Sequence, residues 1–499
     1  MRVRIAILAG LYLTALTTSA WNHSITIDES AHLAAGLSNL QLNRFELYAV
    51  NPPLVKMVAA LPVLKMHPVT NWSSAGSVYG NRNEFLFGSC FVEQNSSRSI
   101  SLYRAARIAC LPFGILGLWM CYRWGCELHG ERGGLLAAAL WAFSPLILGH
   151  GSLITPDVPA AATGMLAIYR FRIWLNETSV WNAMWLGIFA GIALLTKFTW
   201  APLFPLIGLL GWISWRAGKC FQWSVLRRDL LQLLVTFVAA LYVVNALYGF
   251  DRSFTKLGEY EFVSSEFTKP SESARPHESD LSGDRVNRFT GTWLGTIPIP
   301  LPKLYLQGID LQRRDFEPGR MGRSYLMGEW KDGGWWYYYI IGLFVKEPLG
   351  GLILLAMSLV TWMPQLLAAL CRRRSTQMDV NTTDGSPHPA QVPLREYVIL
   401  LLPAVLVFAL VSRRLGSIIM FAISFRRCRS CLCLPRDSQF SPNGVALVCT
   451  VFVHSSPGSW RPSCGTVRTG CRTSMKLLVV QKTGTNGCFP AISIGGKIF

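Results

Sequence analysis

Long apolar runs, separated by short polar or basic turns, dominate the first 411 residues of the chain. Several runs reach about 18 residues, the length of helix that crosses a hydrocarbon core of about 30 Å at about 1.5 Å per residue. The pattern predicts nine membrane-spanning helices. They lie near residues 5–22, 102–122, 133–150, 157–175, 182–197, 199–215, 229–249, 337–363 and 396–411.

Basic residues fall at alternate turns between these runs, which orients the predicted helices. Under the positive-inside rule the arginine-rich turns face the cytoplasm. The opposite face receives an external loop 23–101, a second loop 250–336, and the turns around Asp157 and Lys197. We therefore predict an all-α, multi-pass integral membrane protein. The arginines concerned are Arg2, Arg4, Arg123, Arg132, Arg170, Arg172, Arg216 to Arg228, and Arg372, Arg373 and Arg374.

The segments outside these runs have patterns of their own. In the loop 23–101, helical periodicity runs from Ala31 to Leu40, breaks at Asn51-Pro-Pro53 and resumes from Leu54 to Pro62. Two short amphipathic helices on the outer membrane surface fit this pattern. Segment 371–395 contains a polar, proline-bearing stretch typical of a cytoplasmic linker. The N-terminal apolar stretch has two interpretations, an uncleaved first span or a cleaved signal peptide.

Composition excludes an ordinary soluble domain and gives no support to nucleic-acid binding. Apolar residues make up 51% of the chain, charged residues only 15%, and the mean hydropathy is +0.32. The net charge of +19 could suggest a nucleic-acid partner. However, the basic residues sit mostly beside apolar runs, where cytoplasmic anchoring explains them, and no nucleic-acid-binding motif is present.

Acidic residues at the predicted outer face are the first candidates for chemistry. Asp28 and Glu29 follow the first span, and Asp157 lies in the turn between the third and fourth spans. Carboxylates at a membrane surface are costly unless they are solvated, paired or functional, and a carboxylate can accept the proton of an attacking hydroxyl. The alternative for both positions is a helix N-cap, which favours the same residue types.

Cations on the same face are the second group of candidates. Lys197 interrupts an apolar run, Arg107 lies near the outer end of the second span, and Lys346 precedes Glu347-Pro348. A cation at headgroup depth would stabilise a departing lipid phosphate. The alternative is a basic side chain that snorkels from a helix end. His32, one turn after Asp28, could bind substrate, pack, or join the carboxylates around a divalent metal, so a metal requirement stays open.

Several short motifs, in order, resemble the protein O-mannosyltransferase family of the GT-C superfamily, which also holds the lipid A aminoarabinose transferases. The first is Asp28-Glu-Ser-Ala-His32, followed by Asn51-Pro-Pro-Leu-Val-Lys56 and Ala59-Ala-Leu-Pro62. Ser144-Pro-Leu146, Thr155-Pro-Asp157 and Gly191 to Lys197 continue the series, and Trp335-Trp-Tyr-Tyr338 with Val345-Lys-Glu-Pro348 resembles bacterial members.

The resemblance implies a bacterial inner-membrane enzyme that transfers a sugar, with inversion, from a polyprenyl-phosphate donor to a hydroxyl on a protein, glycan or lipid at the extracytoplasmic face. Mannose and protein O-linked glycosylation are the family's usual associations. Asp28 would be the base, assisted by Glu29 and Asp157. Asn51 stands where many relatives carry histidine, so acceptor-side contacts there are open to change. A transporter or flippase is the alternative; it should keep its ionisable groups near the bilayer midplane and often shows paired repeats.

The residues after Ser412 break with this pattern, because Arg, Cys, Ser and Gly dominate and apolar spans vanish. Permitted codons for Gly416 to Phe425, read in a shifted frame, allow FNHHVRYIL. The same shift over Ser474 to Phe499 allows GGPENGHKWLLSSNIDWGQDL; both strings look like segments of bacterial relatives. We therefore hypothesise a frameshift near Ser412 to Arg414. The division predicted is a transmembrane glycosyltransferase domain, 1–411, and an out-of-frame tail without an evolved fold, 412–499.

Overall fold

The computed structural model of the chain describes most of the first 412 residues, and every structural statement below concerns these. Most of the predicted linker and of the predicted out-of-frame tail lie outside the described residues. The described ranges are 2–72, 82–217, 220, 222–270, 285–317, 324–331, 335, 337–372 and 393–412.

A helical hairpin forms the first part of the bundle. Helix α1 (Arg2–Asn22) packs along α5 (Ser99–Phe143), which bends back on itself at His129 and Gly130. Gly130 has φ +70°, a conformation that glycine adopts at little cost. Across the hairpin the Trp141 indole donates to the Gly114 carbonyl over 3.1 Å. The first arm corresponds to the predicted span 102–122. The predicted span 133–150 is divided at Ser144, so its first part is the second arm and its last part is the separate helix α6 (Pro145–Gly151).

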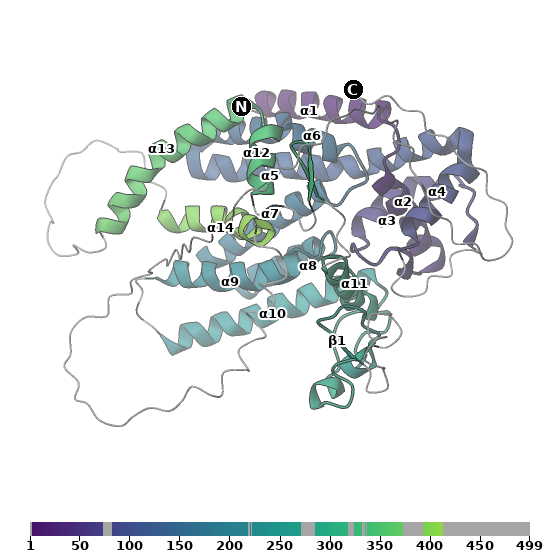
Figure 1. The fold of residues 1–499 in the computed structure, drawn as a ribbon. Coiled ribbons are helices and arrows are strands. Elements are labelled where there is room, and N and C mark those ends of the chain that lie inside the picture. Colours follow the sequence, from purple (N-terminus) through teal and green to yellow (C-terminus); the bar gives the residue numbers. More distant parts are fainter. Residues whose placement is uncertain are drawn as a thin grey trace, which may run out of the picture. The chain divides into compact units, whose positions relative to one another are not determined.

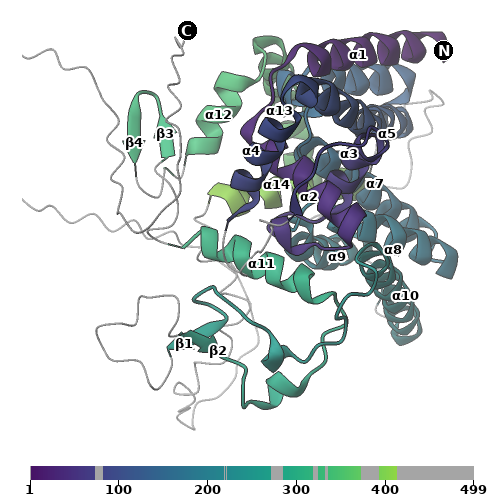
Figure 2. The same cartoon turned by 90° about the vertical axis from the view of Figure 1, so that its right-hand side faces the viewer.

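Six further helices of the described residues belong to the bundle (Figures 1 and 2). Helices α7 and α8 form a second hairpin, and α8 packs along α10. The Trp174 indole of α7 donates to Gln232 of α10 over 2.7 Å, which joins these helices inside the core. The bounds are α6 (Pro145–Gly151), α7 (Asp157–Asn176), α8 (Val180–Leu194), α9 (Trp200–Arg216), α10 (Trp223–Leu247) and α14 (Leu394–Ser412).

Ion pairs gather at the end of the bundle that carries the arginine-rich turns, which we call the basic end. Arg172 bridges Glu127 of α5 at 2.7 Å and Glu396 of α14 at 2.5 Å. Asp229 of α10 pairs with Arg216 and Arg228. The opposite end, which holds Asp28, Asp157 and Lys197, is called the carboxylate end below.

A layer of short helices covers part of the carboxylate end. The two amphipathic helices predicted in this segment are present, as α2 and α3, and a third helix, α4, was not predicted. Close packing in the layer needs glycine, because a Cβ on Gly36 would overlap the Lys56 carbonyl of α3. Another on Gly88 would meet the backbone of Ser30. The bounds are α2 (Ile27–Leu42), η1 (Glu46–Tyr48), α3 (Leu54–Lys65), α4 (Glu84–Asn95) and η3 (Ser96–Arg98).

The second predicted external loop contains regular structure that the sequence did not reveal. Strands β1 (Thr268–Pro270) and β2 (Arg285–Asn287) pair antiparallel, as do β3 (Ser324–Leu326) and β4 (Glu329–Lys331). Helix α11 (Lys303–Asp315) buries Asp310, which accepts the Val263 and Ser264 amides at 2.7 and 3.0 Å. The remaining elements of this region are η4 (Leu257–Glu259) and η5 (Trp293–Thr296).

One expected span is not a straight helix. The apolar run 337–363 divides into α12 (Tyr338–Lys346) and α13 (Leu349–Arg372), bent by 116°. Glu347, at the break, has the extended ψ of 144°. The physical reason is Pro348, which lacks an amide hydrogen and disfavours helical geometry in the residue before it.

The described helices fit a polytopic membrane protein. Three helical segments among the described residues are long and apolar enough to cross a bilayer, namely Val3–Asn22, Glu84–Phe143 and Trp223–Leu247. The bent pair α12–α13 is a fourth if the two helices are counted as one span. Several of the other helices are shorter or more polar. The all-α membrane fold is therefore confirmed, whereas the number of nine spans and the boundary at residue 411 remain predictions.

Candidate active site

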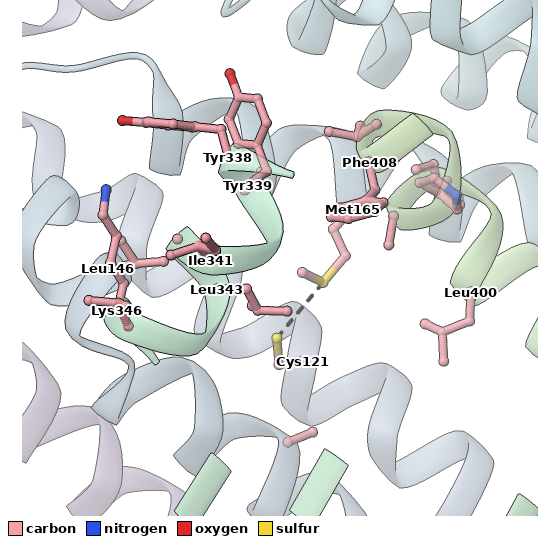
Figure 3. Close-up of a pocket in the computed structure, with 18 of the residues that line it drawn as sticks. Cys121, Leu146, Met165, Tyr338, Tyr339, Ile341, Leu343, Lys346, Leu400 and Phe408 are labelled. Carbon is pink, nitrogen blue, oxygen red and sulfur yellow. Dashed lines mark hydrogen bonds between the residues drawn. The ribbon is translucent and has the colours of Figure 1, made fainter. Parts of the chain in front are cut away.

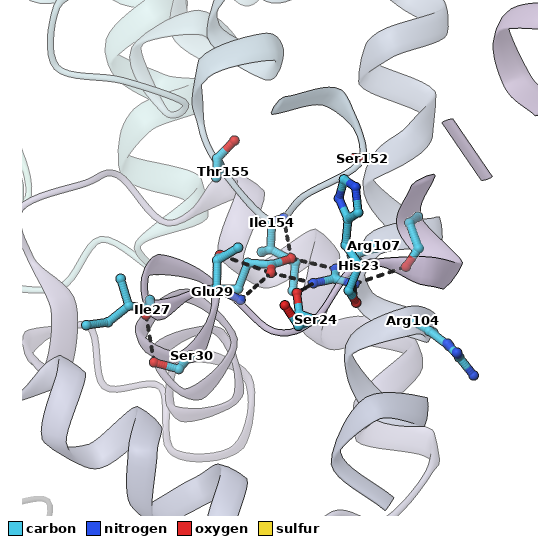
Figure 4. Close-up of polar contacts among 12 residues, drawn as sticks. His23, Ser24, Ile27, Glu29, Ser30, Arg104, Arg107, Ser152, Ile154 and Thr155 are labelled. Atoms are coloured by element: carbon cyan, nitrogen blue, oxygen red, sulfur yellow. Dashed lines mark hydrogen bonds and ion pairs between the residues drawn. The ribbon is translucent and has the colours of Figure 1, made fainter. Parts of the chain in front are cut away.

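A buried ion pair ties the start of α2 to the bundle (Figure 4). Arg107 donates to both oxygens of Glu29 at 2.7 and 2.6 Å, and both side chains are at most 1% exposed. Arg107 also donates to the carbonyls of Ala20, His23 and Ser24 at 3.0, 2.8 and 2.7 Å. All five guanidinium N–H groups are therefore in use. This geometry leaves Arg107 no donor for the predicted lipid phosphate, and we do not carry that role further.

Glu29 is as fully engaged as its partner. Its carboxylate accepts the Thr26 amide and hydroxyl, both at 3.0 Å, as the third residue of a capping box, and the Ile154 amide at 3.1 Å. Burial raises the pKa of Glu29, but the Arg107 and backbone hydrogen bonds outweigh it, so the net pKa lies below the ordinary value. Glu29 thus holds α2 in place as an anion.

Asp28, the residue before Glu29, has a different environment from the buried pair. Its side chain is exposed, and among the described residues we find no ion pair or hydrogen bond to it. Burial raises the pKa of Tyr48 to about 12, and the negative charge of Asp28 contributes in the same direction. Asp28 therefore lies within electrostatic reach of the η1 turn and remains open to substrate.

His32 follows Asp28 by one turn of α2. The imidazole is buried and lies 4.8 Å, ring to ring, from Tyr48. Burial and the Lys56 charge lower the pKa of His32 to about 3, and the Asp157 carboxylate acts against them. His32 is consequently a neutral imidazole at physiological pH. Its electrostatic contact with Asp157 links α2 with the start of α7.

Lys56 organises the turn that carries Asn51. Its ammonium donates to the carbonyls of Tyr48 and Asn51 at 2.5 and 2.7 Å, and burial lowers its pKa to about 7. The Asn51 amide donates to the Tyr48 hydroxyl over 3.1 Å. Tyr48 therefore contacts both Asn51 and His32, the two residues predicted to bind the acceptor or the donor.

Asp157 and Lys197, predicted to share a face, are in direct contact. The Lys197 ammonium donates to one Asp157 oxygen over 2.6 Å, and His150 Nδ1 of α6 lies 3.8 Å from the other. All three side chains are between 32% and 48% exposed. Ile154, three residues before Asp157, is the residue that donates to Glu29. Asp28 and Asp157 thus belong to the same end of the bundle.

A large apolar cavity opens next to this pair (Figure 3). It has a volume of about 1250 Å³ and lies among α5, α7, α12 and α14, with the β3–β4 hairpin at its edge. Ala161 and Trp200 line it, one turn after Asp157 and three residues after Lys197 respectively. Lys346 lies at its rim, exposed and near Leu146. Lys346 thus lines the apolar chamber, and Asp157 and Lys197 lie close in the sequence to residues that line it. The region of these three charged residues is called the cavity mouth below.

Two features of the site escaped prediction. The cavity could not be inferred because its walls come from helices distant in the sequence. His150 was not predicted as a site residue, although it lies near the end of α6, only seven residues before Asp157. Among the described residues, no three His, Cys, Asp or Glu side chains gather in a way that could hold a metal ion, so we build no step on a metal.

An apolar chamber beside charged groups at one end of a helical bundle defines a membrane protein suited to an amphipathic substrate. Residues 101–248 match the family model described as dolichyl-phosphate-mannose-protein mannosyltransferase. The match confirms the resemblance to this GT-C family and supports, in general terms, a membrane glycosyltransferase of mannosyltransferase type. It covers under a third of the chain and includes Asp157 and Lys197 but neither Asp28 nor Lys346. No curated protein and no solved structure matches significantly.

Proposed function

We propose that the chain transfers a sugar, with inversion, from a polyprenyl-phosphate donor to a hydroxyl on a protein, glycan or lipid acceptor. The observation that carries the proposal is the apolar cavity, lined by Ala161 and Trp200, together with the Asp157–Lys197 pair that lies within four residues of them in the sequence. A prenyl chain matches the chamber, and a phosphate matches the ammonium groups at its mouth. The arginine-rich basic end favours the extracytoplasmic side for the carboxylate end.

In this proposal Asp28 is the general base. The acceptor oxygen forms a bond to C1 of the sugar while the bond from C1 to the phosphate oxygen breaks, and Asp28 takes the hydroxyl proton. A single displacement of this kind inverts the anomeric centre, and a carboxylate is a suitable base for it. Asp28 fits because it is exposed and without an ion pair in the described part of the chain, whereas Glu29 is committed to Arg107.

The leaving phosphate keeps the bonding electron pair and gains negative charge. The Lys197 ammonium, which pairs with Asp157 in the structure, offsets this charge, and Lys346 at the cavity rim adds a second cation. His32 and Asn51 lie beside Asp28, where they would contact the sugar or the acceptor. Mannose fits the family description, and the identity of the acceptor is a matter for experiment.

The test uses membranes that carry either the full chain or a version with the predicted reading frame restored. Each preparation is incubated with a panel of labelled polyprenyl-phosphate sugars, and the label is followed into acceptors. We expect transfer from at least one donor, loss of transfer in Asp28→Asn with membrane insertion unchanged, and full transfer in the control Glu93→Gln, an exposed carboxylate of α4.

Two results would count against the proposal. Wild-type rates in Asp28→Asn would remove Asp28 from the reaction. Movement of intact lipid-linked sugar between leaflets, with no label reaching an acceptor, would support the transporter or flippase alternative instead.

A further inference from the structure

His150 has a defined position that the proposed reaction does not yet use. Its backbone carbonyl accepts the Leu153 amide and the Thr155 hydroxyl, both at 3.3 Å, so the turn after α6 is fixed. From there Nδ1 faces the Asp157 oxygen that Lys197 does not contact, at 3.8 Å. Leu146, one helical turn earlier on α6, lines the cavity. His150 therefore faces the Asp157 oxygen that Lys197 leaves free, one helical turn from a residue that lines the cavity.

The charges around His150 come from four elements. Asp157 of α7 is the nearest, and Lys197 reaches the same carboxylate from the turn before α9. Helix α12 brings Lys346 and Glu347 to this side, with Glu347 Oε1 3.5 Å from the Ser144 hydroxyl. Buried His32 of α2 also interacts with Asp157. With His150 neutral, Asp157 has one cationic partner in contact, and that partner is the lysine needed for phosphate.

This arrangement creates a competition for Lys197. In the structure its ammonium is paired with Asp157 at 2.6 Å. A phosphate that binds Lys197 therefore leaves the negative charge of Asp157 less well neutralised. A protonated His150, next to the other carboxylate oxygen, would neutralise that charge again. Histidine is suited to this exchange, since its proton affinity lies near neutral pH and responds to a neighbouring carboxylate.

We propose that His150 is a positioning residue that takes up a proton when the donor phosphate binds, holds Asp157 as an ion pair, and so releases Lys197 to the phosphate. The inference rests on the proposed function, because it assumes a lipid phosphate at the cavity mouth. The proton comes from solvent, which the half-exposed imidazole contacts, and no covalent bond changes in the step.

The experiment measures binding rather than transfer. The full chain, in detergent or nanodiscs, is titrated with a polyprenyl methyl phosphate diester from about pH 5.5 to 8.5, a range that brackets the ordinary imidazole pKa of about 6.5. A diester carries one constant charge in this range, so the ligand itself does not titrate. We expect the affinity of the unaltered chain to fall with rising pH, by up to about tenfold per unit above the imidazole pKa.

Three variants separate the proposed exchange from a structural role. His150→Gln should bind with a flat pH profile, and His150→Lys should keep the tight binding of low pH across the range, because its charge is fixed. The control His23→Gln alters an exposed imidazole whose Nδ1 lies 3.5 Å from the Ser19 hydroxyl, and should retain the original slope.

The outcomes distinguish the two proposals. An unchanged slope in His150→Gln would overturn the role of His150 while leaving the lipid-phosphate donor intact. A flat profile in the unaltered chain, with binding present, would do the same. Absence of diester binding at every pH would remove the donor class itself, and the His150 exchange with it.

Discussion

Replacing Arg107 by methionine removes the cation from the buried pair that anchors α2. The substitution leaves the Glu29 carboxylate 0% exposed without its ionic partner, and it removes the guanidinium donors to three backbone carbonyls. Breaking a buried pair by deleting one partner costs about 3–5 kcal/mol, because an uncompensated charge stays behind. We expect a loss of that size in the free energy of unfolding.

The assay is a denaturant titration of the protein in mixed micelles, with Arg104→Met as the matched control. Arg104 lies one turn before Arg107 on α5, donates to the Trp21 carbonyl at 2.8 Å and stacks over the Trp21 ring at 4.4 Å. Because its charge remains in contact with solvent, its loss should cost about 1 kcal/mol or less. The difference between the two variants isolates the effect of burial.

The dependence of stability on low pH is a second test of the Glu29–Arg107 pair. The pKa of Glu29 is lower in the folded protein, so its contribution to stability is present above the ordinary glutamate pKa of about 4.3 and is lost as the pH falls below it. Glu29→Gln should lack this acid-dependent component. Equal losses for Arg107→Met and Arg104→Met, or an unchanged acid profile in Glu29→Gln, would refute the assignment of the pair as the anchor.

Further expectations concern the site and its supports. Lys197→Met should lower the transfer rate by about 100-fold, with Lys197→Arg less affected, in a donor-sugar assay; a loss below twofold would exclude the lysine from charge stabilisation. Met165→Trp narrows the cavity and should weaken binding of a long-chain polyprenyl phosphate by about tenfold, while a short-chain analogue binds as before. Binding titrations measure both affinities, and an equal loss for the two lipids would contradict a role of the cavity in holding the prenyl chain. Gly36→Ala should destabilise the helical layer by about 1–3 kcal/mol in thermal unfolding, whereas Gly10→Ala, with open space around it, should not; equal stability would argue against the close packing. Because the folded pKa of Lys56 is about 7, below the ordinary 10.4, stability should rise with pH between about 7 and 10; denaturation of Lys56→Met should lack that slope, and its persistence would refute the assignment.

Hydrophobic length predicted much of the helical bundle because an apolar run of span length has few other folds available. The ends of α1, α7 and α14 lie within a few residues of the expected bounds. Prediction failed where a local residue overrode the run, as Pro348 does between α12 and α13. It also failed for α4, whose 12 residues show no clear apolar face.

The candidate site was predictable where topology alone decides proximity. Asp157 begins α7 and Lys197 follows α8, so the two residues lie at the same end of this hairpin, where they are in contact. The same reasoning could not assign Arg107, because a cation at a helix end has the same sequence pattern whether it binds a ligand or pairs internally. Only the packed structure shows its five donors in use. The catalytic and binding roles of the other candidates remain predictions; these are Asp28, Asp157, Lys197, His32, Asn51 and Lys346.

The Glu29–Arg107 pair also constrains how the chain can be assembled during synthesis. Glu29 leaves the ribosome 78 residues before Arg107, and 125 residues before the Ile154 amide that completes its shell. Until those segments arrive, the carboxylate must remain hydrated or protonated beside the first span. The layer with α2 can therefore reach its final position only after the chain has been synthesised as far as Ile154, just before the second helical hairpin.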